Sequence, residues 1–374
     1  MIDRILLFPY YLILKWRDRY YSKPGRKFYT PAVPSLCVGN VTAGGTGKTP
    51  MVELVLRTLQ DSEEWDDKNL AVLSRGYKRE SRGFQQVVAD GAASMFGDEP
   101  LQIKKKFPGV TVAVDKNRVE GCEFLQHPER LASGKNAKKC WYREFPAADF
   151  IVFDDAFQYR KLKAARTMVL VDWNRPVSSD MLLPFGRLRD LPERAGDADI
   201  LVVTKCPAEL SMAEREAFAS RLGITGYSSE TCEGVSARGR RQTVLFAKIR
   251  YGQPVGVYPK TEARYVYSKK IILVSGIAKD TPLRDYLSDF YKIEKRFGFP
   301  DHHKYRWSDI TKIQIALRKN PTASVFTTEK DAQRLLDFPG MPEEIAERLF
   351  MVPIETEFLS EVERNVFRDR IVSL

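Results

Sequence analysis

The stretch Thr42-Ala-Gly-Gly-Thr-Gly-Lys-Thr49 decides the fold of this chain. A short apolar run, Ser35–Asn40, precedes it, and residues 51–59 follow it with the apolar spacing of a helix. In a glycine-rich loop between a strand and a helix, backbone N–H groups point inward at phosphate oxygens, and the helix N-terminus adds positive potential. The context of the stretch therefore predicts a loop that holds the phosphates of a nucleoside triphosphate.

Two side chains of this loop have specific predicted tasks. Lys48 reaches the outer phosphates, and the Thr49 hydroxyl binds Mg²⁺. The loop pattern asks for glycine at position 42, where this chain has threonine, and we expect Gly44 and Gly45 to supply the flexibility instead. The predicted nucleotide-binding residues are Thr42, Ala43, Gly44, Gly45, Thr46, Gly47, Lys48 and Thr49.

The expected nucleotide is ATP. Residues 204–207, Thr-Lys-Cys-Pro, follow an apolar run and are similar to the Asn/Thr-Lys-x-Asp signal for guanine. Pro207 stands where that signal has the acid that accepts hydrogen bonds from the guanine ring. Because this acid is missing, we predict ATP rather than GTP. Together with the predicted role of Thr49, this gives ATP and Mg²⁺ as the expected cofactors.

Short apolar runs, mostly β-branched, recur along the chain between helical or polar stretches. Such alternation predicts an α/β fold with a doubly wound, mainly parallel sheet of the P-loop NTPase type. A change to polar and basic residues at 229–251 precedes an alternating segment at 253–258, which indicates a linker to a second, smaller α/β domain. We expect the last apolar run, 349–354, to pair with this linker. The other strand candidates lie at 35–40, 70–74, 110–114, 150–154, 167–172, 200–204, within 270–277, and at 322–327.

The net charge of +11 indicates an anionic partner, which is nucleic acid, a membrane surface or a phosphorylated substrate. Residues 1–30 hold seven Lys and Arg against two acids, a balance of +5 and nearly half of the excess. Among these charges, the apolar and aromatic run 5–16 is interrupted by Pro9, is too short to span a bilayer, and has no small-residue cleavage site after it. This run either lies in the headgroup region of an anionic membrane or forms a helix packed on the protein.

Composition excludes several other classes of protein. With 43% hydrophobic and 29% charged residues, the chain is neither disordered nor fibrous. Its five cysteines are scattered and form no C-x-x-C pair, so we interpret them as reduced thiols in a cytoplasmic protein. A nucleic-acid-binding module would interleave basic and aromatic residues on one face or carry a reader motif, and neither is evident in the sequence.

Two further segments offer carboxylates for chemistry. The apolar run 150–155 ends in Asp154 and Asp155, and an acid at the end of such a strand holds or orients Mg²⁺ in P-loop enzymes. The run does not decide which of the two faces the metal. In Gly97-Asp-Glu-Pro100, Asp98 or Glu99 could orient and deprotonate an acceptor hydroxyl, but turn chemistry explains this segment equally well.

Histidine is scarce in this chain, which has three in all, and His302 and His303 are adjacent behind Asp301. A histidine that is hydrogen-bonded to a carboxylate can accept a proton. The alternative interpretation of the segment is a solvated loop.

Taken in order, eight motifs that span nearly the whole chain closely resemble the tetraacyldisaccharide 4′-kinase family, the lipid A kinases of Gram-negative bacteria. The resemblance implies transfer of the ATP γ-phosphate to the 4′-hydroxyl of an acylated glucosamine disaccharide 1-phosphate at the cytoplasmic face of the inner membrane. The motifs are Gly39-Asn40, Gly47-Lys-Thr-Pro50, Leu73-Ser-Arg-Gly-Tyr77, Gly97-Asp-Glu-Pro100, Asp154-Asp-Ala-Phe-Gln158, LPFGRLRD at 183–190, Val203-Thr-Lys205 and Asp301-His-His303.

The resemblance also implies roles for single residues. Asp98 matches the family's catalytic aspartate and His302 its partner, so this pair would act as the base on the sugar hydroxyl, with Lys48 on the phosphates. The residues implied at the disaccharide site are Arg75, Tyr77 and Arg189. The residues predicted for the metal site are Thr49, Asp154, Asp155 and Gln158. Thr42 becomes a family trait, because family members also tend to lack the first loop glycine.

The domain organisation implied by the resemblance is two α/β domains joined by a two-stranded linker that closes the cleft. Its parts are a membrane-associating N-terminal helix region at 1–30, a P-loop domain at 31–243, the linker at 244–258 and 349–358, a smaller domain at 259–348 and a C-terminal helix at 359–374. We expect a peripheral monomer that binds the inner-membrane surface and no nucleic acid. The alternative is another P-loop ATP- or GTP-dependent synthetase or metallochaperone NTPase of the same broad fold.

Overall fold

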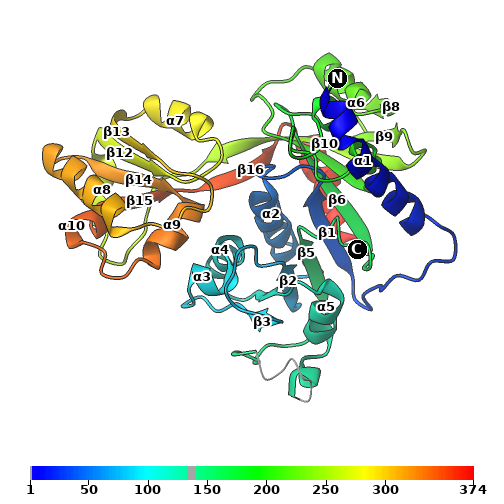
Figure 1. Cartoon of the computed structure of the whole chain (residues 1–374), viewed down its shortest axis with the longest axis horizontal. Helices are drawn as coiled ribbons and strands as arrows, with labels where there is room; N and C mark the ends of the chain where they lie inside the picture. Colours follow the sequence, from blue (N-terminus) through cyan, green and yellow to red (C-terminus); the bar gives the residue numbers. More distant parts are fainter. Residues whose placement is uncertain (1, 133–139) are drawn as a thin grey trace.

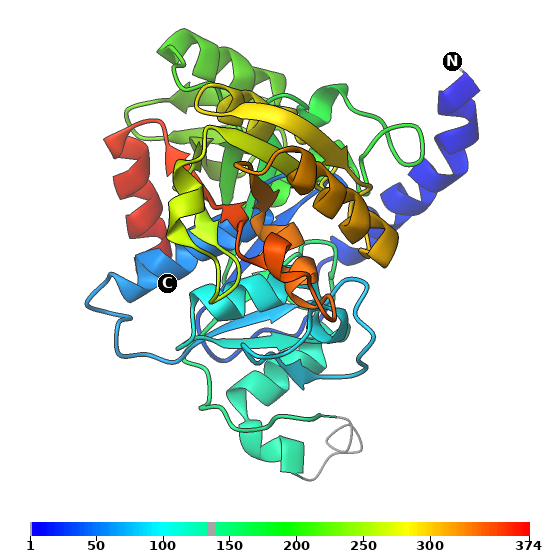
Figure 2. The same cartoon turned by 90° about the vertical axis from the view of Figure 1, so that its left-hand side faces the viewer.

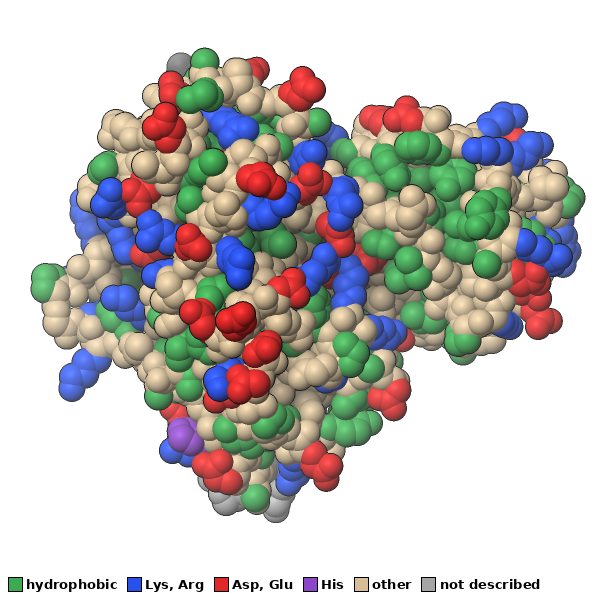
Figure 3. Space-filling model, turned by 180° about the vertical axis from the view of Figure 1, so that it is seen from behind, with side chains coloured by type: hydrophobic (Ala, Val, Ile, Leu, Met, Phe, Trp, Pro, Cys, Tyr) green, Lys and Arg blue, Asp and Glu red, His purple; other side chains and the backbone are tan. Residues whose placement is uncertain are grey.

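The computed structural model describes residues 2–132 and 140–374, with the side chains of the first helix described from Leu7 onward. Met1, which belongs to the predicted N-terminal region, lies outside the described residues. The chain forms two lobes, a larger one built on an 11-stranded sheet and a smaller one built on a 5-stranded sheet (Figure 1). Seen from behind, both lobes carry acidic and basic side chains mixed over the surface (Figure 3).

The larger sheet contains β1 (Ser35–Asn40), β2 (Leu70–Ser74), β3 (Gln85–Gln86), β4 (Thr111–Val114), β5 (Phe150–Asp154), β6 (Arg166–Asp172), β7 (Ile200–Thr204), β8 (Ile224–Ser228), β9 (Glu233–Ser236), β10 (Arg241–Tyr251) and β16 (Ile354–Phe358). Their order is β3-β4-β2-β5-β1-β6-β7-β10-β9-β8, and β16 pairs with β10. All neighbours from β4 to β10 are parallel, whereas the outer strands are antiparallel. This confirms the predicted doubly wound, mainly parallel α/β sheet.

The larger lobe buries both faces of this sheet. Within β1, Leu36 and Val38 contribute to one hydrophobic core and Cys37 to the other, because successive side chains of a strand point to opposite faces. Helices cover both faces, as a parallel sheet requires. They are α1 (Ile2–Tyr21), α2 (Lys48–Gln60), α3 (Ala93–Phe96), α4 (Asp98–Lys106), α5 (Arg118–Gln126), α6 (Met212–Arg221) and α11 (Glu361–Val372), with short 3-10 helices at Pro128–Ala132, Val177–Ser179 and Pro192–Asp197.

The smaller lobe is also α/β, with sheet order β11-β15-β14-β12-β13, parallel except at β11. Its strands are β11 (Val255–Gly256), β12 (Lys270–Ser275), β13 (Lys292–Gly298), β14 (Ser324–Thr328) and β15 (Leu349–Val352). Its helices are α7 (Thr281–Ser288), α8 (Trp307–Lys319), α9 (Glu329–Leu336) and α10 (Glu343–Ala346), with a 3-10 helix at Ala263–Tyr267. Helix α9 packs on α4 of the larger lobe, and the α3–α4 segment lies beside the smaller lobe in both views (Figures 1 and 2).

The two lobes are joined by an antiparallel ribbon in which Ala247 to Tyr251 pairs with Ile354 to Phe358. The expected pairing of 349–354 with the linker is confirmed at three positions, because Phe350 and Met351 pair with residues 256 and 255, and Ile354 pairs with Tyr251. Residues 349–352 form β15, which also pairs with β14 inside the smaller sheet. Within the predicted linker segment 244–258, residues 244–246 pair with β7 and residues 255–256 pair with β15, so the ribbon between the two sheets is shorter than this segment. Apolar runs mark strands, but they do not say which sheet a strand joins.

Sequence reasoning missed β3, β8 and β9 toward the two ends of the larger sheet and β13 at one end of the smaller sheet. The smaller sheet ends in β13, Lys-Ile-Glu-Lys-Arg-Phe-Gly, whose residues are exposed or half-buried. An edge strand needs no continuous apolar run, and charged side chains there discourage pairing with other chains. Within residues 2–132 and 140–374, no helix is long and apolar enough to cross a membrane.

Candidate active site

The glycine-rich loop leaves β1 at the carboxyl edge of the sheet, where β5 lies on one side and β6 on the other. Open α/β sheets bind ligands at this kind of position. Three loop glycines have positive φ, and Gly47, with φ 85°, stands directly before α2. Thr42 forms a β-bridge with Leu188 and is not among the residues with positive φ, so this position does not need glycine.

The loop is held by hydrogen bonds from three neighbouring segments. The Asn40 side chain donates to Thr46 Oγ1 at 2.5 Å, and Thr204 Oγ1 donates to the Thr46 carbonyl at 2.9 Å. The backbone N–H of Ala43 donates to the carbonyl of Arg187 at 2.6 Å. The LPFGRLRD segment and the Thr-Lys-Cys-Pro segment, both selected from the sequence, thus support the loop.

Asp155 lies among cations at the phosphate end of the site. Its carboxylate is 3.9 Å from Lys48 Nζ, and Arg189 donates to both of its oxygens, once at 3.0 Å. Although burial alone would raise it, Lys48 and Arg189 hold the pKa of Asp155 at about 2. Arg189, implied at the disaccharide site, therefore lies against Asp155, and it also donates to Asn40.

Asp154 has one carboxylate oxygen that accepts no hydrogen bond from the described residues. It is buried, and Ser74 Oγ donates to its Oδ2 at 2.8 Å, whereas its Oδ1 has no hydrogen-bond partner among the described residues. Burial, together with the charges of Glu99 and Asp155, raises the pKa of Asp154 to about 6. A buried carboxylate oxygen without a hydrogen-bond partner, close to the charges of two further carboxylates, fits a cation.

The other two residues predicted for the metal site are Thr49 and Gln158, and they differ in their surroundings. Thr49 is the second residue of α2, and Gln158 uses its amide to donate to the Asn40 carbonyl. The described residues contain no cluster of three or more Asp, Glu, His or Cys side chains that could hold a metal ion. Mg²⁺ in nucleotide sites is usually bound by one or two carboxylates together with the substrate phosphates. The residues present are therefore compatible with Mg²⁺ bound to a nucleotide.

The structure brings Asp98 and His302 together from the two lobes. Asp98 is the first residue of α4, and its Oδ2 lies 3.0 Å from His302 Nδ1. His302 has a positive φ of 61°, and the ring of Tyr77 lies 5.2 Å from its ring. Tyr77 and Arg75 follow β2 and are exposed. The pairing of Asp98 with His302 agrees with the resemblance.

The second histidine has a different environment. His303 Nε2 lies 2.9 Å from Asp309 Oδ2, and its ring stacks on Phe299 at 4.4 Å. In the part of the chain that the structure describes, the side-chain hydrogen bond and ring contacts of His303 lie within the smaller lobe, whereas His302 contacts Asp98 and Tyr77 of the larger lobe.

Sequence reasoning missed two cations on α9. Lys330 Nζ lies 3.0 Å from Glu99 Oε1 and 3.4 Å from His302 Nε2, and Arg334 donates to Asp98. The two residues are four apart on a helix that begins directly after β14. That placement, at the carboxyl end of a parallel strand, was the available signal.

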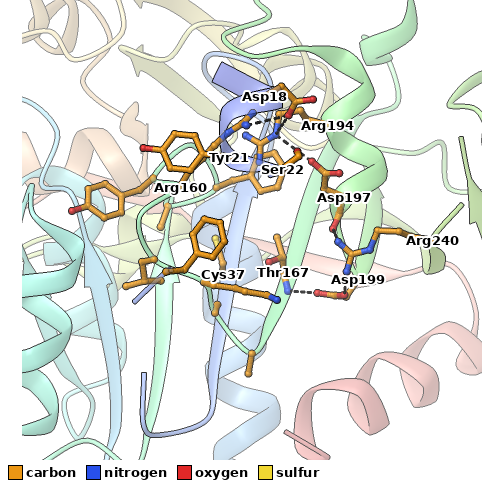
Figure 4. Close-up of a pocket in the computed structure, with 18 residues that line it drawn as sticks. Asp18, Tyr21, Ser22, Cys37, Arg160, Thr167, Arg194, Asp197, Asp199 and Arg240 are labelled. Carbon is orange, nitrogen blue, oxygen red and sulfur yellow. Dashed lines mark hydrogen bonds and ion pairs between the residues drawn. The ribbon is translucent and has the colours of Figure 1, made fainter. Parts of the chain in front are cut away.

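A cavity of about 400 Å³ lies away from this site, beneath the last turn of α1. Figure 4 shows Asp18 of α1 facing Arg194, with Asp197, Asp199 and Arg240 on the same side. Asp18 pairs with Arg160 at 3.1 Å and with Arg238 at 2.9 Å, so α1 is tied to the larger lobe.

A phosphate-binding loop between the central strand and its helix is the hallmark of P-loop nucleotide-binding enzymes, and the fold and site place this chain in that class. A family model described as tetraacyldisaccharide-1-P 4′-kinase matches residues 4–372. The chain belongs to the tetraacyldisaccharide 4′-kinase family, which confirms the resemblance and decides against the synthetase and metallochaperone alternative.

Relatives and a solved structure agree with this assignment. The chain is 33% identical over 353 residues to a tetraacyldisaccharide 4′-kinase of Bacteroides thetaiotaomicron, which covers 91% of this chain and 84% of that relative. It is 34% identical over 364 residues to one of Flavobacterium johnsoniae, covering 96% and 93%. The fold matches the "apo" form of LpxK from Aquifex aeolicus in complex with ATP, with a TM-score of 0.66, 22% identity, and coverage of 100% and 99%.

Proposed function

We propose that this chain transfers the γ-phosphate of ATP to the 4′-hydroxyl of tetraacyldisaccharide 1-phosphate, which gives lipid IV(A). The observation that carries the proposal is the contact of Asp98 with His302, which assembles an acid–base pair from the two lobes. Glu99, which follows Asp98 in the chain, lies close enough to Asp154 for its charge to raise the pKa of that carboxyl.

At the donor end, the chain provides charge and orientation. The loop amides and the N-terminus of α2 bind the phosphates, Lys48 reaches the outer ones, and Thr49 with Asp154 would hold Mg²⁺. When bound, Mg²⁺ neutralises charge on the phosphates. Asp155 is fixed by Lys48 and Arg189, so we assign to it the positioning of these two cations.

At the acceptor end, Asp98 orients the sugar hydroxyl. Burial alone would raise the pKa of Asp98, but its bonds to His302 and Arg334 hold this pKa at about 2. A carboxylate this acidic accepts a hydrogen bond well and a proton poorly. Phosphoryl transfer relies mainly on positioning and electrostatic stabilisation, so an orienting carboxylate is sufficient.

We assign α1 and a nearby loop to the membrane surface. Leu7, Tyr10, Tyr11 and Leu14 pack against the core of the larger lobe. The side chains of Phe8, Leu12, Ile13 and Trp16 remain 49–66% exposed, and those of Met181, Leu183 and Phe185 are 39–48% exposed. Because α1 is apolar on its packed face and on its exposed face, it can lie on the protein and in the headgroup region at the same time. This supports peripheral binding at the cytoplasmic face of the inner membrane.

A product assay tests the proposed function. Purified protein is incubated with labelled ATP, Mg²⁺ and the lipid A disaccharide 1-phosphate, and we expect a labelled bisphosphorylated lipid. Asp98→Ala should abolish most of this product and leave the affinity for ATP within about threefold, because Asp98 acts on the acceptor. No product from the wild-type protein would refute the substrate, and normal turnover of Asp98→Ala would remove Asp98 from the mechanism.

A further inference from the structure

Among the described residues, Arg334 makes the shortest hydrogen bond to the Asp98–His302 pair. Its Nε and Nη2 both donate to Asp98 Oδ2, at 2.9 and 2.6 Å, and His302 Nδ1 lies 3.0 Å from the same oxygen. Arg334 and His302 belong to the smaller lobe, whereas Asp98 belongs to the larger one. The smaller lobe thus binds a single oxygen of the catalytic aspartate with three donor atoms.

The other oxygen of Asp98 is left available. Among the described residues, every hydrogen bond to the Asp98 side chain ends on Oδ2. A carboxylate oxygen that is ionised and free of donors accepts strongly from a hydroxyl group. With Oδ2 fixed, the direction in which Oδ1 points is fixed as well.

Arg334 is itself held rigidly. Its side chain is only 8% exposed, and its Nη1 donates to Asp331 Oδ1 at 3.0 Å. Asp331 in turn accepts from the backbone N–H of Gly276 at 2.8 Å and from Thr328 Oγ1 at 2.7 Å. These bonds connect the guanidinium to the ends of β12 and β14, so contacts within the smaller lobe set its orientation.

We propose that Arg334 is a positioning residue that clamps Asp98 Oδ2 from the smaller lobe and thereby directs Asp98 Oδ1 at the acceptor hydroxyl. This inference rests on the proposed function for the identity of the acceptor. Lys330, one turn earlier on α9, contacts His302 Nε2 and Glu99 Oε1. Lys330 and Arg334 therefore contact different atoms of the Asp98–His302 pair.

The kinetic test compares Arg334→Ala and Arg334→Lys with Arg318→Lys as the matched control. Arg318 is a 67% exposed cation of α8 in the same lobe, and it pairs with Glu344. We expect Arg334→Ala to lower kcat about 100-fold, because loss of orientation acts on the chemical step, and to change KM for ATP by less than about threefold. The kcat of Arg334→Lys should lie between those of Arg334→Ala and the wild type, and the kcat of Arg318→Lys should match that of the wild type.

Chemical rescue separates positioning from folding. Added guanidinium at millimolar concentration should raise the rate of Arg334→Ala several-fold and leave Asp98→Ala unchanged, since the added cation can only bind the carboxylate if it is present. Turnover of Arg334→Ala within threefold of wild type, a loss confined to KM, or equal stimulation of Asp98→Ala would each overturn the inference. If Arg334→Ala fails to fold, undiminished turnover of Arg334→Lys overturns it.

A spectroscopic readout is independent of the lipid. The chain has three histidines, so the ring signals of His302 can be assigned in ¹H–¹⁵N spectra with Asp98→Asn as reference. We expect Arg334→Lys to shift the His302 Nδ1–H signal and Arg318→Lys to leave it in place. An unchanged signal overturns the clamp even if wild-type protein phosphorylates no lipid, whereas a shifted signal with inactive wild type refutes only the proposed substrate.

Discussion

The unpartnered carboxylate of Asp154 gives a prediction about pH. Burial together with the charges of Glu99 and Asp155 raises its pKa to about 6, so the group is protonated below that pH and ionised above it. Mg²⁺ binds only the ionised form. Binding of the magnesium–nucleotide complex should therefore weaken as the pH falls through about 6, and at pH 5, with about one molecule in ten ionised, Asp154's contribution to affinity should be about tenfold smaller.

The measurement is titration with a fluorescent ADP analogue at saturating Mg²⁺ between pH 5 and 8. Nucleotide phosphates ionise in the same range, so the informative quantity is the ratio of the dissociation constants of Asp154→Asn and wild type at each pH. We expect this ratio to reach a plateau above pH 7 and to fall about tenfold by pH 5. Arg318→Lys, at an exposed side chain of the smaller lobe, is the control, and its ratio should be flat. A flat ratio for Asp154→Asn would refute the assignment of this carboxylate to the metal.

Three further perturbations test other parts of the molecule. Lys48→Ala should lower turnover about 100-fold or more in the product assay, because one cation on the transferring phosphoryl is lost, and an unaffected variant would contradict the role of the loop. Leu12→Ser with Trp16→Ser should reduce co-sedimentation with phosphatidylglycerol vesicles without lowering the melting temperature, since both side chains are about half or more exposed; unchanged binding would remove α1 from the membrane contact. Lys106→Met should destabilise the protein by about 3 kcal/mol in urea unfolding, because it removes the nearer cation of the buried Glu53, 2.8 Å away, and leaves, among the described residues, only Arg57 at 3.7 Å. A cost below about 0.5 kcal/mol would show that this buried pair contributes nothing.

The sequence predicts the centre of the larger sheet well, because strands buried on both faces are short continuous apolar runs. The structure places β2, β5 and β7 at the predicted residues. Residues 349–352 show what such a run leaves open: it is apolar and forms a strand, but its pairing with β14 in the smaller sheet was not predicted. Pairing between distant segments is not encoded in periodicity.

Some residues of the site can be predicted from the sequence alone, and others cannot. The phosphate loop is a contiguous motif whose chemistry follows from local backbone geometry, so residues alone predict it. Asp98 and His302 are 204 positions apart, and only the family resemblance paired them. Lys330 and Arg334 were missed, because cations spaced by four residues on a helix are typical of a solvated face. These two cations contact the site because α9 packs on α4, and this packing is visible only in the folded structure.

The joining ribbon has a consequence for how the molecule is assembled. Tyr251 and Ile354 face each other across it, so the whole smaller lobe is an insertion whose two ends meet at one point of a hairpin. Insertions with adjacent ends can be removed with little cost to the host domain. Replacing residues 252–353 with a short turn should leave a compact nucleotide-binding protein, so the chain combines an autonomous phosphate-binding unit with a removable part that completes the acceptor side.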